Sequence, residues 1–261
     1  MGDVTTYPNG IFCWIDLGTP DVAGAKAFYS NLFGWATEDF PAGDGETYTV
    51  CRLRGKDVAA IHEHPKEEGA EWSSYISVDD ADQAASRAAE LGARVLMDPF
   101  DVMDVGRMSL IRDPAGAVVS LWQPKTHIGA RFVNEVGAWG WNELVTPGMD
   151  VAKSFYGDLF GWKAEDVPAN IPRGIFTMGD LLIGGVHAPT PQEGDASRWT
   201  LSFNVADAEV GAARVEELGG QILLPPMQIP IGTFSIVSDP AGAAFTLAAV
   251  PGGPVRGVDG S

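Results

Sequence analysis

The chain contains one phrase twice, and this repeat limits the possible folds more than any other feature. Residues 14–35 (WIDLGTPDVAGAKAFYSNLFGW) and 141–162 (WNELVTPGMDVAKSFYGDLFGW) agree at 12 of 22 positions, at an offset of 127. A second matching pair, 106–121 and 232–247, has an offset of 126. A period of about half of the 261 residues is much longer than that of solenoid repeats. The sequence therefore predicts two copies of one domain.

Each half in turn contains the same small unit twice. The apolar pattern predicts a strand at 11–18, a helix that begins with Thr19 as its cap and stops at Gly34, and three strands within 35–62. Residues 72–123 repeat this order, and the second half of the chain repeats the whole scheme. We therefore expect an α+β protein built from four βαβββ units.

The net charge of −18, from 35 acidic and 17 basic residues, narrows the classes of partner. Such a surface repels phosphate backbones and anionic lipids, so we expect neither a nucleic-acid nor a membrane partner. The charge serves solubility, and it is also compatible with a cationic ligand. Cys13 and Cys51 lie in apolar runs, which predicts two buried reduced thiols. No apolar stretch approaches the ~20 residues of a membrane span, and no signal pattern precedes the first strand, so we expect a cytoplasmic protein.

Four motifs resemble those of the vicinal-oxygen-chelate superfamily, which includes glyoxalase I, bleomycin-resistance proteins, fosfomycin-resistance enzymes and extradiol dioxygenases. They are AFYSNLFGW and SFYGDLFGW after the first helix of each half, and RDPAGAVVSLWQ and SDPAGAAFTLAA at its end. The resemblance implies two tandem glyoxalase-like domains, each a curled mixed sheet around a cavity with helices outside. We expect domains at 8–125 and 137–250, a linker at 126–136 and a loose tail at 251–261.

A narrower resemblance is to tandem two-domain proteins of actinobacteria. The stretches that carry it are GRMSLIRDPAGA, LWQPKTHIGA and VNEVGAWGWNEL. Some of those proteins are regarded as glyoxylases, and others as hydroxylase-like proteins of antibiotic pathways. The resemblance therefore implies either a glyoxalase-like activity or a role in the chemistry of an antibiotic.

The superfamily also implies a divalent metal ion, held by His, Gln or Glu side chains from particular strands. In this chain six of the corresponding positions hold residues that are poor ligands, namely Trp14, Trp141, Ser73, Thr200, Ser120 and Thr246. A neutral indole has no nitrogen lone pair to give, and a neutral hydroxyl binds these ions weakly. We therefore expect no metal and no cofactor, and we assign these six residues to ligand binding instead.

Two histidines, His62 and His187, recur at matching positions of the fourth strand in each half. One imidazole cannot hold an ion that needs three or four donors. We count both histidines among the ligand-binding candidates. The alternative is that each is a hydrogen-bonded structural residue.

Strand alternation suggests which side chains share a face. It places Phe12, Trp14 and Asp16 on one face of the first strand, and Trp139, Trp141 and Glu143 on one face of its counterpart. Each of these two strands thus places an indole and, two residues beyond it, a carboxylate on the same face.

Asp16 and Glu143 are the candidate catalytic residues, because a carboxyl desolvated against indole can act as a general acid or base. Trp14 and Trp141 would form an aromatic wall that suits a planar or cationic ligand. Arg107 could bind a ligand anion or neutralise one of the two carboxylates. The alternative is that the indoles only fill the space that a metal vacated.

Three functions are compatible with these residues. The first is a small-molecule-binding protein with metal-free, Trp-lined cavities, whose ligand is an antibiotic or a metabolite. The second is a metal-independent lyase, isomerase or hydroxylase-like enzyme on a carbonyl or polyketide-like substrate. The third is a glyoxalase-like or dioxygenase-like enzyme, as the superfamily suggests. Because a tandem chain can satisfy its own domain pairing, we expect a monomer or a homodimer.

Overall fold

The computed structural model of the chain describes residues 3–43, 45–168, 171–191 and 193–250. The expected tail at 251–261 lies outside these residues. The first half contains β1 (Phe12–Thr19), α1 (Val22–Phe33), β2 (Ala36–Gly43), β3 (Glu46–Leu53), β4 (Lys56–Glu63), a short 3₁₀ helix (Lys66–Glu68), β5 (Glu71–Ser77), α2 (Ala81–Glu90), β6 (Arg94–Val102), β7 (Gly106–Arg112) and β8 (Val118–Pro124). The second half contains β9 (Trp139–Val145), α3 (Met149–Phe160), β10 (Lys163–Asp166), β11 (Arg173–Met178), β12 (Leu181–His187), β13 (Arg198–Asn204), α4 (Ala208–Glu217), β14 (Gln221–Ile229), β15 (Gly232–Ser238) and β16 (Ala244–Ala249).

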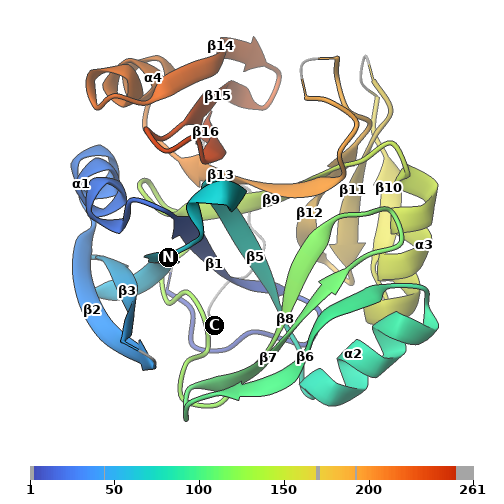
Figure 1. Cartoon of the computed structure of the whole chain (residues 1–261). Helices are drawn as coiled ribbons and strands as arrows, with labels where there is room; N and C mark the ends of the chain where they lie inside the picture. The colour runs from blue at the N-terminus through green and yellow to red at the C-terminus, as the bar shows by residue number, and fades with distance from the viewer. Residues whose placement is uncertain (1–2, 44, 169–170, 192, 251–261) are drawn as a thin grey trace.

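Each half forms one eight-stranded mixed sheet. The order is β2-β3-β4-β1-β5-β8-β7-β6 in the first half and β10-β11-β12-β9-β13-β16-β15-β14 in the second. Within a unit the first strand runs parallel to the last, and the two units of a half meet edge to edge through an antiparallel pair, β1 with β5 or β9 with β13. The prediction of four βαβββ units in an α+β fold is confirmed (Figure 1).

Helix α1 shows how local sequence sets the boundaries of an element. The predicted stop is confirmed, since Gly34 adopts a left-handed conformation with φ of 75° and its N–H bonds the carbonyl of Ser30. The predicted start is wrong: Asp21, not Thr19, caps the helix, by accepting a hydrogen bond from the Gly24 N–H. The Thr19 hydroxyl instead accepts a hydrogen bond from the N–H of Asp21, two residues later in the chain.

A bulge in the first strand of each half changes which side chains share a face. Phe12 pairs with Ile76 while Trp14 pairs with the adjacent Tyr75, so Phe12 and Trp14 face opposite sides of the sheet. The same break in register separates Trp139 from Trp141. The expectation that alternation carries Phe12 and Trp139 to the side of the carboxylates is therefore wrong, because the bulge adds one residue.

One face of each sheet is consequently buried between the two halves. Phe12 contacts Trp162 and Trp199 of the second half, with ring centroids 5.7 and 4.9 Å apart. Phe203 of the second half packs in turn against Phe33, Trp35 and Trp72 of the first half. The repeated Phe-Tyr…Phe-Gly-Trp phrase thus builds the aromatic core between the halves.

Polar contacts lock the halves together in a reciprocal way. The hydroxyl of Tyr29 in α1 lies 3.1 Å from Asp239 Oδ2, and that of Tyr156 in α3 lies 2.9 Å from Asp113 Oδ2. Each hydroxyl also accepts a hydrogen bond from an indole N–H of its own half, Trp72 or Trp199. The two aspartates are those of the repeated Asp-Pro-Ala-Gly motif, so each copy of the phrase binds the motif of the other copy. We call these contacts the interlock.

Two further expectations concern membranes and thiols. Among the described residues no helix is both long and apolar enough to cross a membrane. Cys13 and Cys51 are buried and unpaired, as predicted, and burial raises the pKa of the Cys51 thiol to about 12.

Candidate functional site

The opposite face of each sheet carries Trp14 or Trp141, and we call it the open face. In the first half the register places one row of side chains across it, in the order Trp14, Tyr75, Ser120, Leu110 and Met97. The matching row of the second half is Trp141, Ser202, Thr246, Ile236 and Leu224. Each row runs from an indole through hydroxyls to an apolar wall.

Asp16 lies on the same face of β1 as Trp14, two residues further along the strand, and its carboxyl is held by two tyrosines. Its Oδ2 accepts hydrogen bonds from the hydroxyls of Tyr48 (3.0 Å) and Tyr75 (2.7 Å). The Tyr48 hydroxyl accepts a bond in turn from the indole N–H of Trp14, at 2.8 Å. The carboxyl is only 1% exposed. Trp14 therefore helps to orient the Asp16 carboxyl indirectly, through its hydrogen bond to Tyr48.

The protonation of Asp16 is shifted by this environment. Burial raises the pKa of the carboxyl above its ordinary value of 3.8, and this effect exceeds the opposing effects of the His62 charge and of the two tyrosine hydroxyls. The cause is desolvation, because a carboxylate away from water loses more hydration than two hydroxyl donors restore. The site thus favours a carboxyl that keeps its proton to a higher pH than an exposed aspartate.

His62 is the neighbour of Asp16 that reaches solvent. Its Nε2 lies 3.8 Å from Asp16 Oδ1, and its side chain is 33% exposed. Its ring stacks on Tyr48, with centroids 6.1 Å apart. Ser73 is the direct cross-strand partner of Asp16 on β5, and it is half-buried. The predicted candidates His62, Ser73 and Asp16 are therefore brought together, with Ser120 beyond Tyr75.

The apolar wall of the open face is partly exposed to solvent. Met97 and Phe100 on β6 are 45% and 38% exposed, and their partners Leu110 and Met108 on β7 are half-buried. In the second half Leu224 and Met227 at the equivalent positions are also exposed. Adjacent apolar side chains beside a polar floor are typical of a surface that receives a ligand.

In the second half an ion pair replaces the tyrosine cradle. The carboxylate of Glu143 lies 2.9 Å from the guanidinium of Arg173 and accepts the indole N–H of Trp141 at 2.7 Å. Arg173 pairs with His187 on β12 as Tyr48 pairs with His62 on β4, so it stands where the first half has Tyr48. Thr200 donates to the backbone carbonyl of Glu143. Asp16 and Glu143 therefore occupy equivalent positions, but the partners of Asp16 are neutral hydroxyls and the partner of Glu143 is a cation.

His187 is turned toward a different acid from its counterpart. Its Nε2 lies 3.7 Å from Glu193 Oε1, and its Nδ1 lies 2.9 Å from the carbonyl of Ala188. Glu193 is held in place by hydrogen bonds from the backbone and hydroxyl of Thr190. The acid–histidine pair of the second half therefore does not include Glu143.

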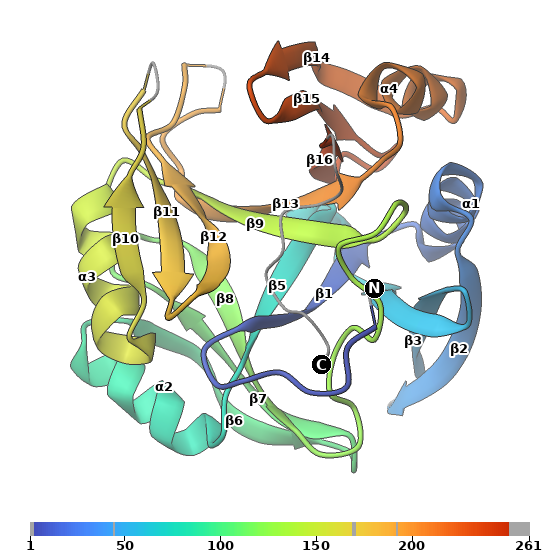
Figure 2. The same cartoon turned by 180° about the vertical axis from the view of Figure 1, so that it is seen from behind.

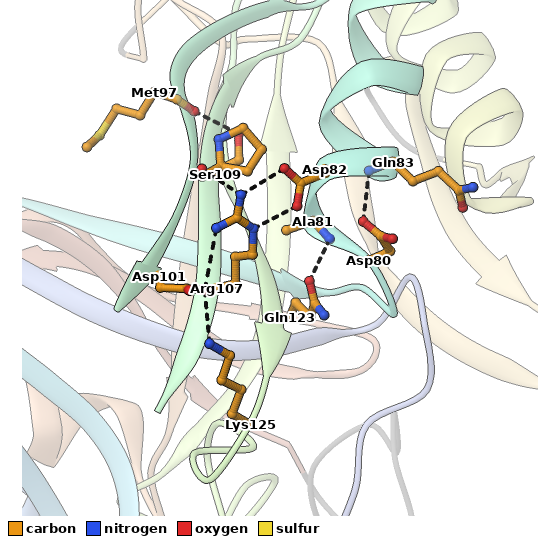
Figure 3. Close-up of polar contacts among 11 residues, drawn as sticks. Asp80, Ala81, Asp82, Gln83, Met97, Asp101, Arg107, Ser109, Gln123 and Lys125 are labelled. Atoms are coloured by element: carbon orange, nitrogen blue, oxygen red, sulfur yellow. Dashed lines mark hydrogen bonds and ion pairs between the residues drawn. The ribbon is translucent and has the colours of Figure 1, made fainter. Parts of the chain in front are cut away.

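Arg107 lies on the other side of the sheet from Asp16. Its neighbour Met108 belongs to the open face, so Arg107 points toward α2, where it forms a double hydrogen bond with Asp82 (Figure 3). It also contacts Asp101, which Lys125 shares. The expectation that Arg107 neutralises Asp16 or Glu143 is wrong. Side chains alternate along β7, and that of Arg107 lies on the face that is turned toward α2 and away from both carboxylates.

The segment between the halves closes one end of the first open face. The ring of His127 meets Trp14 edge-on at 4.6 Å, and the His127 carbonyl accepts the indole N–H of Trp122. Figure 2 shows this segment running past the marked N-terminus to β9. His127 is buried, and burial lowers the pKa of its imidazole. Trp14 is thereby covered at 3% exposure, whereas Trp141 is half-buried.

The donor set does not fit the divalent ion that the superfamily implies. Both indole N–H groups at the ligand positions already donate hydrogen bonds, so they offer no lone pair. In the part of the chain that the structure describes, no three His, Cys, Asp or Glu side chains gather as metal ligands would. Each open face instead offers one acid and one nearby histidine or arginine.

Sequence comparison identifies the family of both halves. The family model described as "Glyoxalase/Bleomycin resistance protein/Dioxygenase superfamily" matches residues 11–121 and again 135–247. A protein of Mycobacterium tuberculosis named "Putative glyoxylase CFP32" is 41% identical over 249 residues, which cover 92% of this chain and 95% of that protein. The "Anthracycline biosynthesis protein DnrV" of Streptomyces peucetius is 32% identical over 260 residues, which cover 94% of each chain.

Solved structures agree with this fold. The Mn(II)-bound glyoxalase from Novosphingobium aromaticivorans has a TM-score of 0.65 at 15% identity, and the match covers 100% of this chain and 87% of that one. The 2,3-dioxygenase LapB from Pseudomonas sp. KL28 has a TM-score of 0.66 at 14% identity, over 97% of each chain. With two matched domains and relatives of full length, the chain belongs to the Glyoxalase/Bleomycin resistance protein/Dioxygenase superfamily.

Proposed function

We propose that this protein binds a planar organic molecule on the open face of its first half. The observation that carries the proposal is the row from Tyr75 and Ser120 to the exposed Met97, with Phe100 beside it, which sets hydrogen-bonding groups beside an apolar wall on one surface. Exposed apolar side chains cost solubility unless they serve an interaction. Methionine side chains adapt to flat, irregular ligands because their thioethers are flexible and polarisable.

The chemistry of the floor favours a ligand without a full positive charge. The Asp16 carboxyl is buried and is held by the hydroxyls of Tyr48 and Tyr75, so it does not present a negative charge at the surface. Ser73, Ser120 and His62 add polar groups that suit carbonyl or phenolic oxygens. A relative named for anthracycline biosynthesis supports polycyclic aromatic compounds as the first class of ligand to try. A planar cation is the alternative that a screen would reveal.

The test uses alizarin, a planar hydroxyanthraquinone, and follows the quenching of tryptophan fluorescence. Met97→Lys places a charge on the wall of the first half, and Leu224→Lys places the same charge at the matching position of the second half. Losing part of a buried apolar contact of about 1 kcal/mol should weaken binding about fivefold in Met97→Lys. Both residues are exposed, so folding should tolerate either change.

The proposal requires that Met97→Lys weakens alizarin binding and that Leu224→Lys leaves it unchanged. Unchanged binding in Met97→Lys together with weakened binding in Leu224→Lys would place the ligand on the second half. Saturable binding that neither variant changes would remove the open faces from the proposal altogether.

The second candidate is a metal-independent enzyme acting on a carbonyl or polyketide-like substrate. Asp16 favours it, because a buried carboxyl beside a solvent-reaching imidazole is an arrangement for proton transfer. Asp16→Asn should abolish turnover while binding remains, and Glu143→Gln serves as the matched change in the second half. Equal losses of binding and folding in Asp16→Asn would indicate a structural carboxyl instead.

A glyoxalase-like activity, as the mycobacterial relative's name would suggest, is decided by a separate measurement. Elemental analysis of protein purified without chelators gives the amount of metal per chain. Near-stoichiometric zinc, nickel, manganese or iron would support a metal-dependent reaction, with His62 and His187 as the first ligands to substitute. A metal content near zero would leave the two proposals above.

A further inference from the structure

The first turn of α2 is held by two side chains from the neighbouring sheet. The guanidinium of Arg107 forms a double hydrogen bond with Asp82, at 2.7 and 2.8 Å (Figure 3). Beside it, the side-chain carbonyl of Gln123 accepts the N–H of Ala81 at 3.0 Å. Arg107 and Gln123 are paired residues of β7 and β8, so both side chains lie on the helix side of the sheet. In the first half a guanidinium and a carboxamide therefore occupy this place together.

The second half keeps the acid of this arrangement and loses both of the other side chains. Glu209 is the acid in the first turn of α4, as Asp82 is in the first turn of α2. Thr233 and Ala249 are paired on β15 and β16, where the first half has the arginine and the glutamine. The Thr233 hydroxyl donates to Gln228 at 2.6 Å, so its one hydrogen is not available to the acid. The sheet thus offers Glu209 no cation in place of the missing arginine.

A hollow lies at the start of α4, and we call it the α4 hollow. Its volume is about 490 Å³, within the range of roughly 300–1,000 Å³ that small-molecule sites have. Asp207, Glu209 and Thr233 are its polar lining residues, and the rest of the lining is valine and alanine. Ala249, which is part of that lining, has no side-chain carbonyl for the N–H of Ala208, the residue that corresponds to Ala81. The α4 hollow therefore combines a carboxylate and a backbone donor whose partners in the first half have been replaced by smaller residues.

We propose that the α4 hollow binds a small molecule that carries a guanidinium group and an amide carbonyl, as an arginine amide does. The guanidinium pairs with Glu209, and the carbonyl accepts the N–H of Ala208, so the ligand supplies the two groups that the sheet supplies in the first half. Thr233 lies on the helix side of the second sheet, as Arg107 does on the first. The site is therefore separate from both open faces and does not rest on the proposed function.

The shape and charge of the ligand follow from the first half. A guanidinium presents its N–H groups as a planar fork that matches a carboxylate, and Arg107 already shows this geometry on Asp82. The valines and alanines of the lining suit the aliphatic stem of such a ligand. The net charge of −18 favours the approach of a cation. Because Glu209 is exposed and an exposed ion pair contributes little, we expect a dissociation constant on the order of 1 mM.

The test titrates the full chain with Nα-acetyl-arginine amide and follows the backbone amides of Ala208, Glu209 and Thr233 by ¹H–¹⁵N NMR. Nα-acetyl-citrulline amide is the matched probe, because its urea group has nearly the shape of a guanidinium but no charge. We expect saturable shifts at these amides with the arginine compound, and a dissociation constant about tenfold larger for the citrulline compound. Equal affinity for the two compounds, or no saturable shift at these amides, would overturn the proposal.

Three variants locate the binding. Glu209→Gln should weaken binding of the arginine compound about tenfold, because it removes the charge that the guanidinium meets. Glu216→Gln removes the same charge from another exposed position of α4 that is not part of the lining, and it should leave binding unchanged. Thr233→Arg restores the arginine of the first half, which should pair with Glu209, fill the α4 hollow and abolish binding. Because both glutamates are exposed, their comparison stands even if Thr233→Arg does not fold.

Other outcomes would contradict the proposal in distinct ways. Equal weakening in Glu209→Gln and Glu216→Gln would reduce the binding to a general effect of the negative charge. Undiminished binding in a folded Thr233→Arg variant would place the compound elsewhere on the chain. Arg256, which lies outside the described residues, is another source of the same guanidinium. Arg256→Gln should leave the affinity for the probe unchanged, and a tighter binding in that variant would make the chain's own arginine the occupant in place of a separate ligand.

Discussion

The interlock predicts an unusually costly tyrosine-to-phenylalanine substitution. In Tyr29→Phe one oxygen is removed that accepts the Trp72 indole N–H at 3.1 Å and lies 3.1 Å from Asp239 Oδ2. A buried donor left without a partner costs about 1–3 kcal/mol, and a hydrogen bond to a carboxylate contributes about 1.5–3 kcal/mol. Because Asp239 keeps the N–H groups of Ala241 and Ala243, we expect a total near 3 kcal/mol.

The measurement is urea unfolding followed by tryptophan fluorescence, and Tyr7→Phe is the matched control. The Tyr7 hydroxyl is also buried, but it donates one hydrogen bond to a neutral carbonyl, that of Ala130, at 2.7 Å. Its loss should cost about 1 kcal/mol. For a chain of this length, about 3 kcal/mol corresponds to a melting temperature lower by roughly 6–12 °C.

Repeat symmetry extends this prediction to Tyr156→Phe, which should cost a similar amount through Trp199 and Asp113. Because the interlock joins the two sheets, unfolding should remain a single transition in the unsubstituted protein. If Tyr29→Phe costs no more than Tyr7→Phe, the hydroxyls between the halves contribute little, and aromatic packing alone holds the halves together.

Three further predictions concern charge and space. Burial raises the pKa values of the Asp16, Asp113 and Asp239 carboxyls, so the folded chain binds their protons more tightly than the unfolded chain does. The free energy of unfolding should therefore fall as pH rises above 3.8 through the raised pKa values. Urea unfolding at pH 5 and pH 7 checks this, and a lower stability at pH 5 would contradict it. Arg107→Met should leave the free energy of unfolding almost unchanged and alizarin binding intact, because the acidic partners of Arg107 are exposed and lie on the helix side of the sheet; weakened binding would return Arg107 to the ligand site. Gly185→Ala would push its Cβ into the Glu143 carboxylate, so we expect a changed Trp141 emission with a stability loss of about 1 kcal/mol or less, and an unchanged spectrum would contradict the ion-paired site.

The sequence was sufficient for the architecture because its signals were local or repeated. Turn residues and apolar periods marked the units, and Gly34 marked the end of α1 correctly. The bulge at Phe12 was missed because an alternating pattern assumes one residue per step, and nothing in the composition of β1 announces an extra residue. Arg107 was misplaced for a related reason, since a face can be assigned only when the partners of a strand are known.

Several residues of the candidate site could not be found from the sequence at all. Tyr48, Tyr75 and Arg173 are single polar residues in strands and form no motif. They reach Asp16 or Glu143 only because the sheet sets distant strands side by side. The interlock joins residues 210 and 43 positions apart, although the repeated phrase and the repeated aspartate motif were each visible.

The interlock also bears on how such a chain could have arisen. One half alone carries both complementary groups, Tyr29 and Asp113, just as the other carries Tyr156 and Asp239. Two copies of an ancestral half, related by a twofold axis, could therefore have made the same pair of contacts between separate polypeptides. Gene fusion would have made that association independent of protein concentration. Freed from the need to be identical, the two open faces could then acquire a tyrosine cradle on one side and an arginine on the other.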